Sequence, residues 1–122
     1  MRRDVLELRQ FYASPLGRAA REMVSRKVIE TWGDARELDV LGLGYATPFL
    51  GSIRPSARRV VAAMPAQQGV ELWPAEARNL ACLSEEDALP FQNAFFDRIL
   101  AVHALEESRD PLALLREVWR VL

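Results

Sequence analysis

The sequence predicts an α/β fold in which a parallel sheet is covered by helices on both faces. Short continuous apolar runs, typical of strands buried on both faces, occupy residues 38–44, 59–64, 79–83 and 96–102. Helix-start signals and helical spacing of apolar residues occur between or beside these runs, so strands alternate with helices along the chain. The chain has 122 residues, the size of one domain. We therefore expect a single domain, residues 1–122.

The first 33 residues are expected to form a helical cover beside a core made of residues 37–122. Ser14 and Pro15 are a helix-start signal, with serine as N-cap and proline in the first turn. Gly33 is expected to end this helix. Residues 5–12 contain a shorter apolar patch that we expect to pack onto or over the main body. The apolar face of the main helix is made by Leu16, Ala20, Met23, Val24 and Val28.

The first strand, residues 38–44, runs directly into a turn that contains Gly42 and Gly44. Thr47 and Pro48 follow at once and are expected as the N-cap and first residue of a helix. That helix must be short, because a glycine and a proline interrupt the next few residues. The order strand, glycine turn, helix follows.

The second strand, residues 59–64, is ended by Pro65. Residues 65–78 have no clean helical period and are expected to form a loop with at most one turn of helix. Residues 79–83 and 96–102 are the third and fourth strands, and the fourth has the clearer pattern.

The last helix is predicted to begin at Asp110 and Pro111, an N-cap followed by a first-turn proline. Its apolar residues recur at helical spacing. They are Leu112, Leu115, Val118, Trp119 and Leu122.

Several groups that can bind a ligand follow strands, so we expect them at the carboxyl edge of the sheet, where open α/β folds bind ligands. The turn with Gly42 and Gly44 allows close backbone approach, although two glycines in a turn can serve the backbone alone. The acidic residues 85–87 follow the third strand and are either ligand acceptors or a solvated loop. His103 follows the fourth strand and is a candidate base. Because no second nitrogen or sulfur ligand lies near it, we expect no metal site.

Composition excludes several classes of protein. A net charge of −1 does not fit a general nucleic-acid binder. The apolar runs are too short for a membrane span, so no membrane partner is expected. The charged N-terminus lacks the apolar stretch of a signal peptide, so we expect a cytoplasmic protein. The single cysteine, Cys82, excludes an intramolecular disulfide, and its apolar surroundings favour a packing role.

Taken in order, these motifs resemble those of class I S-adenosylmethionine-dependent methyltransferases, in particular their small-molecule branch. Residues 89–91, Leu-Pro-Phe, and residues 95–100, Phe-Phe-Asp-Arg-Ile-Leu, resemble the family's passage into its fourth strand. Residues 103–106 and 110–122 resemble the segment and helix that follow. Residues 38–46 resemble the glycine-rich loop that holds the cofactor. The motifs occur in the family's order and at its separations.

The resemblance implies a Rossmann-like three-layer sandwich whose parallel strands have the order 3-2-1-4. It also implies that S-adenosyl-L-methionine is the cofactor, and that a methyl group passes to an acceptor, expected to be a small molecule. His103 is the candidate catalytic base. The positions expected at the cofactor are Gly42, Gly44, Tyr45, Ala46, Met64, Glu85, Glu86 and His103. Within this set the glycine turn would face the methionine portion and ribose, and the two glutamates would lie beside the adenine. Tyr12 and the N-terminal helix resemble the cover that such enzymes add over the pocket.

The chain departs from the family's pattern at three cofactor positions. Val40 stands where an acidic residue usually precedes the first glycine by two positions, and Asp39 is one position too early. Ala46 replaces the third glycine. Met64 replaces the carboxylate that binds the ribose hydroxyls, and such a loss costs about 1–3 kcal/mol if a buried hydroxyl goes unpaired. Glu71 is a candidate replacement from the loop.

The resemblance also covers only the first four strands of a seven-strand sheet. The fourth strand is then an apolar edge, which is a liability for a free monomer. We therefore expect the N-terminal part of a longer methyltransferase, inactive by itself, or a chain in which a partner or a second copy covers this edge.

Two other functions remain open. One is a non-catalytic relative that serves as a binding or regulatory module, which Val40 and Met64 favour. The replacement Met64→Asp would separate an eroded cofactor site from a differently built one. The other is a dinucleotide oxidoreductase using the same glycine turn. It predicts a charged residue at the position of Met64 to contact the ribose.

Overall fold

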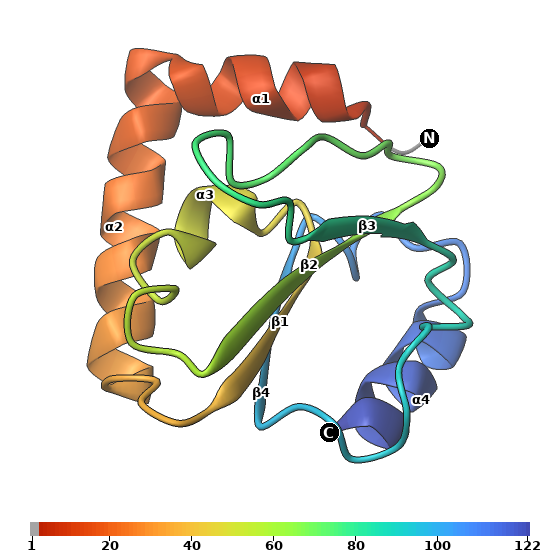
Figure 1. Ribbon diagram of the computed structural model, residues 1–122. Helices are drawn as coiled ribbons and strands as arrows, with labels where there is room; N and C mark the ends of the chain where they lie inside the picture. The colour runs from red at the N-terminus through yellow and green to blue at the C-terminus, as the bar shows by residue number, and fades with distance from the viewer. Residues whose placement is uncertain (1–2) are drawn as a thin grey trace.

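The computed structural model describes residues 3–122 and shows a parallel sheet between helices (Figure 1). Four strands of this part of the chain make the sheet: β1 (Asp39–Gly44), β2 (Arg59–Pro65), β3 (Ala81–Ser84) and β4 (Arg98–Val102). All neighbouring strands pair in parallel, in the order β3-β2-β1-β4. The predicted fold class and strand order are confirmed.

One face of the sheet is covered by α4 (Pro111–Val121). Leu41 and Leu43 of β1 project onto this face because side chains alternate along a strand. They pack in one buried cluster with Leu114 and Val121 of the helix. The core on this side therefore joins β1 to the last helix.

The opposite face is covered by α2 (Pro15–Trp32) and α3 (Thr47–Leu50). Val40 of β1 projects onto this second face and packs with Leu50 and Val28. With helices on both faces, the arrangement has the three layers that the strand pattern predicts.

The helix starts at Ser14 and Asp110 are confirmed. The Ser14 side chain accepts a hydrogen bond from the Gly17 amide, and Asp110 accepts one from the Ala113 amide. The predicted N-cap at Thr47 is wrong. α3 begins one residue earlier than predicted, after Ala46, so Thr47 lies in the first turn of the helix and is not its N-cap.

The apolar patch near the N-terminus forms a helix of its own, α1 (Val5–Ala13). It lies across the carboxyl ends of the strands, along the top of Figure 1. Val5 and Leu8 pack against Tyr45 and Met64 in a separate buried cluster. The expectation that this segment packs over the main body is confirmed.

The third and fourth strands begin two residues later than predicted. Before β3, the Asn79 side chain accepts hydrogen bonds from the Trp73 and Ala81 amides, which folds the chain into a turn instead of a strand. Before β4, the amides of residues 95 and 96 donate to the Val121 carbonyl of α4. Residues 66–80 form no helix. Nowhere in residues 3–122 is there a helix with the length and hydrophobicity to cross a bilayer.

β4 lies at the edge of the sheet and has a paired neighbour on one side only. The helix after it, α4, buries one apolar face and exposes a second. Trp119 is 82% exposed, and the other exposed members of this face are Leu112, Leu115 and Leu122. The side of α4 that carries these residues is therefore an exposed apolar surface.

Candidate functional site

The carboxyl edge of the sheet brings the glycine turn next to the end of β4. The Tyr45 amide donates a hydrogen bond of 2.7 Å to the carbonyl oxygen of Val102. Gly44 has φ of +85°, and a Cβ atom at this position would collide with the same carbonyl oxygen. Gly44 is therefore required by both backbone conformation and close approach.

Gly42 has a packing role. A Cβ atom here would lie 2.6 Å from Leu50 Cδ1 and 2.9 Å from Ala46 Cβ, so the missing side chain lets α3 lie against β1. Ala46 is fully buried in this contact. Because α3 has only four residues, the dipole at its amino end is small and contributes little to binding an anionic group.

His103 lies at the end of β4 with its side chain 19% exposed. Its Nε2 is 2.8 Å from the hydroxyl oxygen of Tyr12 in α1, and its Nδ1 is 3.4 Å from a carboxylate oxygen of Glu106. Burial raises the pKa of Tyr12, which keeps its hydroxyl protonated at neutral pH. With a proton on Nδ1 facing Glu106, Nε2 accepts the hydrogen bond from Tyr12. Two groups therefore orient the imidazole.

Tyr12 also packs on the residue after the glycine turn. Its ring stacks on Tyr45 with centroids 5.9 Å apart and meets Phe49 edge to face at 5.6 Å. Tyr45 donates a hydrogen bond of 3.0 Å to Glu71, whose other oxygen lies 3.6 Å from an Arg9 nitrogen. Burial and the Glu71 carboxylate raise the pKa of Tyr45 far above its usual value. Two side chains of α1 thus contact polar groups at the carboxyl edge: Tyr12 contacts His103, and Arg9 contacts Glu71.

Gln68, in the loop after β2, is 2% exposed. Its side-chain nitrogen donates to the His103 carbonyl at 3.1 Å and to a Glu107 carboxylate oxygen at 3.4 Å. Its backbone carbonyl accepts a hydrogen bond from the Val5 amide of α1 at 2.8 Å. Gln68 therefore ties together the ends of β2 and β4 and the start of α1.

Glu85 and Glu86 do not join this group. Glu85 is exposed, and one of its oxygens lies 3.5 Å from the side-chain nitrogen of Gln67. Glu86 is buried and accepts hydrogen bonds from the Ser108 hydroxyl and the Arg109 amide. In this structure Glu86 holds the loop before α4.

Two of the three departures from the expected cofactor pattern, Val40 and Met64, and the neighbouring Asp39 have clear structural surroundings. Val40 and Met64 are fully buried among apolar side chains. Asp39 lies at the amino end of β1, away from the turn, and forms a two-bond ion pair with Arg58 at 2.7 and 3.1 Å. Arg58 lowers the pKa of Asp39.

Cys82 is half-buried in β3, and burial raises the pKa of its thiol.

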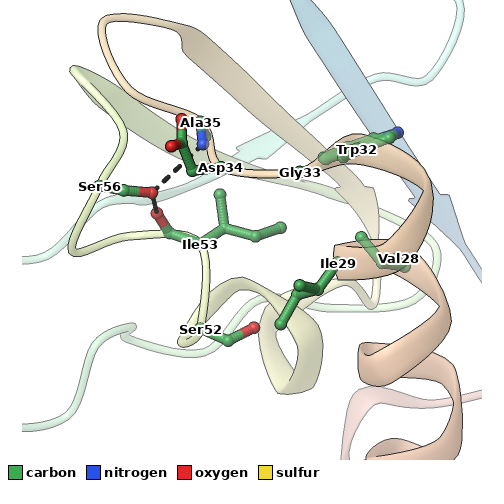
Figure 2. A pocket seen from close by; sticks show the side chains of 9 residues that line it. All are labelled: Val28, Ile29, Trp32, Gly33, Asp34, Ala35, Ser52, Ile53 and Ser56. Atoms are coloured by element: carbon green, nitrogen blue, oxygen red, sulfur yellow. Dashed lines mark hydrogen bonds between the residues drawn. The ribbon is translucent and has the colours of Figure 1, made fainter.

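A separate cavity of about 170 Å³ lies between the end of α2 and the segment after α3 (Figure 2). It is near the amino end of β1, opposite the carboxyl edge. The hydroxyls of Ser52 and Ser56, which line it, donate to the carbonyls of Phe49 and Ile53. With its hydroxyls paired and the remaining lining mainly apolar, it is a packing gap. Within residues 3–122 no cluster of three or more metal-ligating side chains occurs.

The structure thus brings together four expected positions: Gly44, Tyr45, Met64 and His103. Sequence reasoning missed Gln68, because a glutamine in an aperiodic loop carries no local signal. Its position two residues after the proline that ends β2 is the available clue, since residues just beyond a strand lie at the carboxyl edge.

Comparisons with known proteins agree with this architecture. The family described as "Methyltransferase domain" matches residues 38–122. Among solved structures, the crystal structure of the YcgJ protein from Bacillus subtilis is similar, with a TM-score of 0.69 and 24% sequence identity. That match covers 83% of this chain and 46% of the YcgJ chain, so this chain spans about half the length of its structural neighbour. No curated protein matches significantly.

The family match covers the whole sheet, from the start of β1 to the end of α4, and therefore includes the glycine turn and His103. The YcgJ likeness independently supports the fold. The chain therefore belongs to the methyltransferase domain family.

Proposed function

We propose that this chain binds S-adenosylmethionine at the carboxyl edge of its sheet and takes part in transfer of the methyl group to a small-molecule acceptor. One observation carries the proposal: the Gly44 turn and His103 lie side by side, joined by the Tyr45–Val102 hydrogen bond of 2.7 Å. A turn whose glycine lets a ligand approach the backbone closely, beside a potential base, is suited to hold a cofactor next to the reacting group.

The groups at this edge fit the proposed cofactor. A nucleoside carrying an amino acid needs aromatic surface and hydrogen-bond acceptors. Tyr12 and Tyr45 supply the rings, and Glu71 and Gln68 supply acceptors. The Glu71 carboxylate accepts from Tyr45 and has further acceptor sites, and it is the proposed partner of the ribose hydroxyls in place of Met64. S-adenosylmethionine supplies a methyl group on a positively charged sulfur.

The chain's own contribution is to position the reactants and to remove a proton. His103 Nε2 accepts a proton from the acceptor if Tyr12 moves aside, and Glu106 steadies the resulting imidazolium. α1 excludes water from the turn by burying Tyr45. Positioning of this kind is worth about 7–11 kcal/mol in favourable cases. The acceptor is proposed to be a small molecule, in keeping with the branch that the motifs resemble.

Calorimetric titration of S-adenosylhomocysteine into the 122-residue chain tests cofactor binding. We expect saturable binding in the micromolar range, and none of NAD⁺, which tests the oxidoreductase alternative in the same experiment. The absence of heat with S-adenosylhomocysteine, from a chain whose circular dichroism shows it folded, would refute the proposal. Binding of NAD⁺ alone would favour the oxidoreductase.

A second candidate is a non-catalytic binding module, which the cover over the turn favours. Met64 is 0% exposed beneath Val5 and Leu8, where the family has a ribose-binding carboxylate. A Met64→Asp replacement would put a carboxylate into this apolar cluster, so it is expected to destabilise the domain and cannot separate the two functions.

The variant Tyr12→Ala separates them better, because α1 then loses its ring contacts with Tyr45 and Phe49. A module predicts that neither the parent chain nor this variant binds S-adenosylhomocysteine. The enzyme predicts that the parent chain binds it, and that the variant binds it with faster association and faster release, because the cover is loosened and the ring of Tyr12 is lost.

A further inference from the structure

The side chain of Gln68 crosses the carboxyl end of β1. Gln68 follows β2, and its nitrogen reaches the His103 carbonyl, which follows β4, at 3.1 Å. In the sheet, β1 lies between β2 and β4. A contact between the segments that follow the two strands flanking β1 must therefore pass over the end of β1, where the Gly44 turn lies.

The orientation of the Gln68 side-chain amide is determined by the two acceptor oxygens that it faces. Its nitrogen lies 3.1 Å from a carbonyl oxygen and 3.4 Å from a carboxylate oxygen of Glu107. Both are acceptors, and the carboxylate is paired with Arg3 at 3.2 Å. Turning the amide over would set its oxygen against two oxygens, so the nitrogen must face them.

The oxygen of the same amide is buried and finds no hydrogen-bond partner within residues 3–122. Buried side-chain acceptors without a partner are uncommon in proteins and costly. The residue cannot readily turn away, because its backbone amide donates to Pro65 at 3.0 Å and its carbonyl accepts from Val5 at 2.8 Å. A buried, unpartnered acceptor is thus held at the carboxyl edge of the sheet.

We propose that this oxygen accepts a hydrogen bond from the α-ammonium group of the bound cofactor. The inference rests on the proposed function and deepens it by adding a binding residue. The surrounding groups favour a cationic donor: the His103 carbonyl and the Glu107 carboxylate both lie against the same amide. Acceptor oxygens attract an ammonium group and disfavour a carboxylate. Gln68 is therefore a contact of the cofactor's amino-acid portion.

Calorimetry with two nucleosides tests this contact in the 122-residue chain. S-adenosylhomocysteine carries the ammonium group, whereas 5′-methylthioadenosine keeps the nucleoside and sulfur and lacks the amino acid. The variant Gln68→Met preserves side-chain length and removes the acceptor. We expect it to weaken binding of S-adenosylhomocysteine about tenfold or more, as for a hydrogen bond to a charged group. Binding of 5′-methylthioadenosine should stay within about twofold of the parent chain.

The matched control is Gln67→Met, which changes the neighbouring exposed glutamine. It should alter neither affinity. Equal weakening of both nucleosides by Gln68→Met would overturn the inference, because it would show that Gln68 only holds the edge together. Unchanged binding of S-adenosylhomocysteine would overturn it as well.

A ligand-side measurement does not depend on any variant folding. The parent chain should bind the deaminated analogue of S-adenosylhomocysteine about tenfold or more weakly than the parent ligand. Equal affinities would overturn the inference while leaving the proposed function standing. If the parent chain binds none of the nucleosides, the proposed function fails and the inference fails with it.

Discussion

The sheet has two borders that differ in exposure: one is covered by a helix, and the other is open to solvent. At the carboxyl edge, α1 closes over the glycine turn, and Tyr45 and Met64 beneath it are at most 3% exposed. At the lateral edge, β4 has no further strand beside it in residues 3–122, and Trp119 of the adjacent helix is 82% exposed.

The contacts explain what separates the two borders. The cover at the carboxyl edge combines apolar packing with a few directional contacts, Tyr12 to His103 and Arg9 to Glu71, each weak enough to break and re-form. The lateral border offers the unpaired side of β4 and exposed apolar side chains of α4. The first border is therefore suited to a ligand that enters and leaves, and the second to a lasting protein contact.

The largest effect is expected at the glycine turn. Gly44→Ala should lower the free energy of unfolding by about 3 kcal/mol or more, because the added methyl collides with the Val102 carbonyl at a positive φ. Urea denaturation measures this. Gly51→Ala is the matched control, since a methyl group added there would meet no atom of residues 3–122 within 4 Å. A similar loss in both variants would refute the role assigned to the turn.

The second effect concerns the lateral border, where we propose self-association through β4 and the exposed face of α4. Sedimentation should show dimers of the parent chain that dissociate on dilution. Trp119→Ser should weaken the dimer about tenfold or more, since a buried tryptophan anchor is typically worth about 2 kcal/mol or more. Leu16→Ser removes a similarly exposed apolar side chain from α2 and should leave the dimer intact. A parent chain that stays monomeric at high concentration contradicts the proposal.

The third effect concerns the amino end of the sheet, which lies away from both α1 and the glycine turn and serves as a reference for the two borders. Asp39→Asn should cost about 1 kcal/mol at neutral pH through loss of the ion pair with the exposed Arg58. Because Arg58 lowers the pKa of Asp39 in the folded state, this contribution is present above the carboxyl's usual pKa and disappears as pH falls through the lower folded value. Unfolding measured from neutral to strongly acidic pH should show the two proteins converging in acid, whereas a constant difference would exclude the ionic explanation.

The smallest effect is expected at the cover. Tyr12→Phe keeps the ring stacked on Tyr45 and removes the hydroxyl that meets His103 at 2.8 Å. The loss should be about 0.5–1 kcal/mol. A double-mutant cycle with His103→Gln should attribute most of this loss to the pair, and additive effects of the two changes would mean that the hydroxyl contributes through other neighbours.

Capping signals in the sequence correctly predicted where α2 and α4 begin. Ser14 and Asp110 each cap the helix that directly follows, so neighbouring residues determine the outcome. Thr47 shows the limit of this reasoning, because α3 begins one residue before the position that the Thr-Pro signal indicates. Asn79 likewise folds the chain into a turn before β3.

The candidate site was predicted in part, because strand ends converge on one edge in any parallel sheet. Gly44 and His103 follow from that rule. The partners of His103 and of the glycine turn do not, since Tyr12 lies 91 residues from His103 and Gln68 lies 35 residues from it. Contacts of such separation depend on how the finished layers pack, which a pattern of neighbouring residues does not encode.

The docking of α1 has a consequence for how the domain opens. Its amide at Val5 donates to the Gln68 carbonyl, and its Tyr12 reaches His103, so its docking onto the sheet depends on contacts that are remote in sequence and absent until the sheet has formed. Such elements join late in folding and detach first under native conditions. Hydrogen exchange at the Val5 amide should therefore be much faster than at the β1 amides, and its rate reports how often the edge of the sheet is open to solvent.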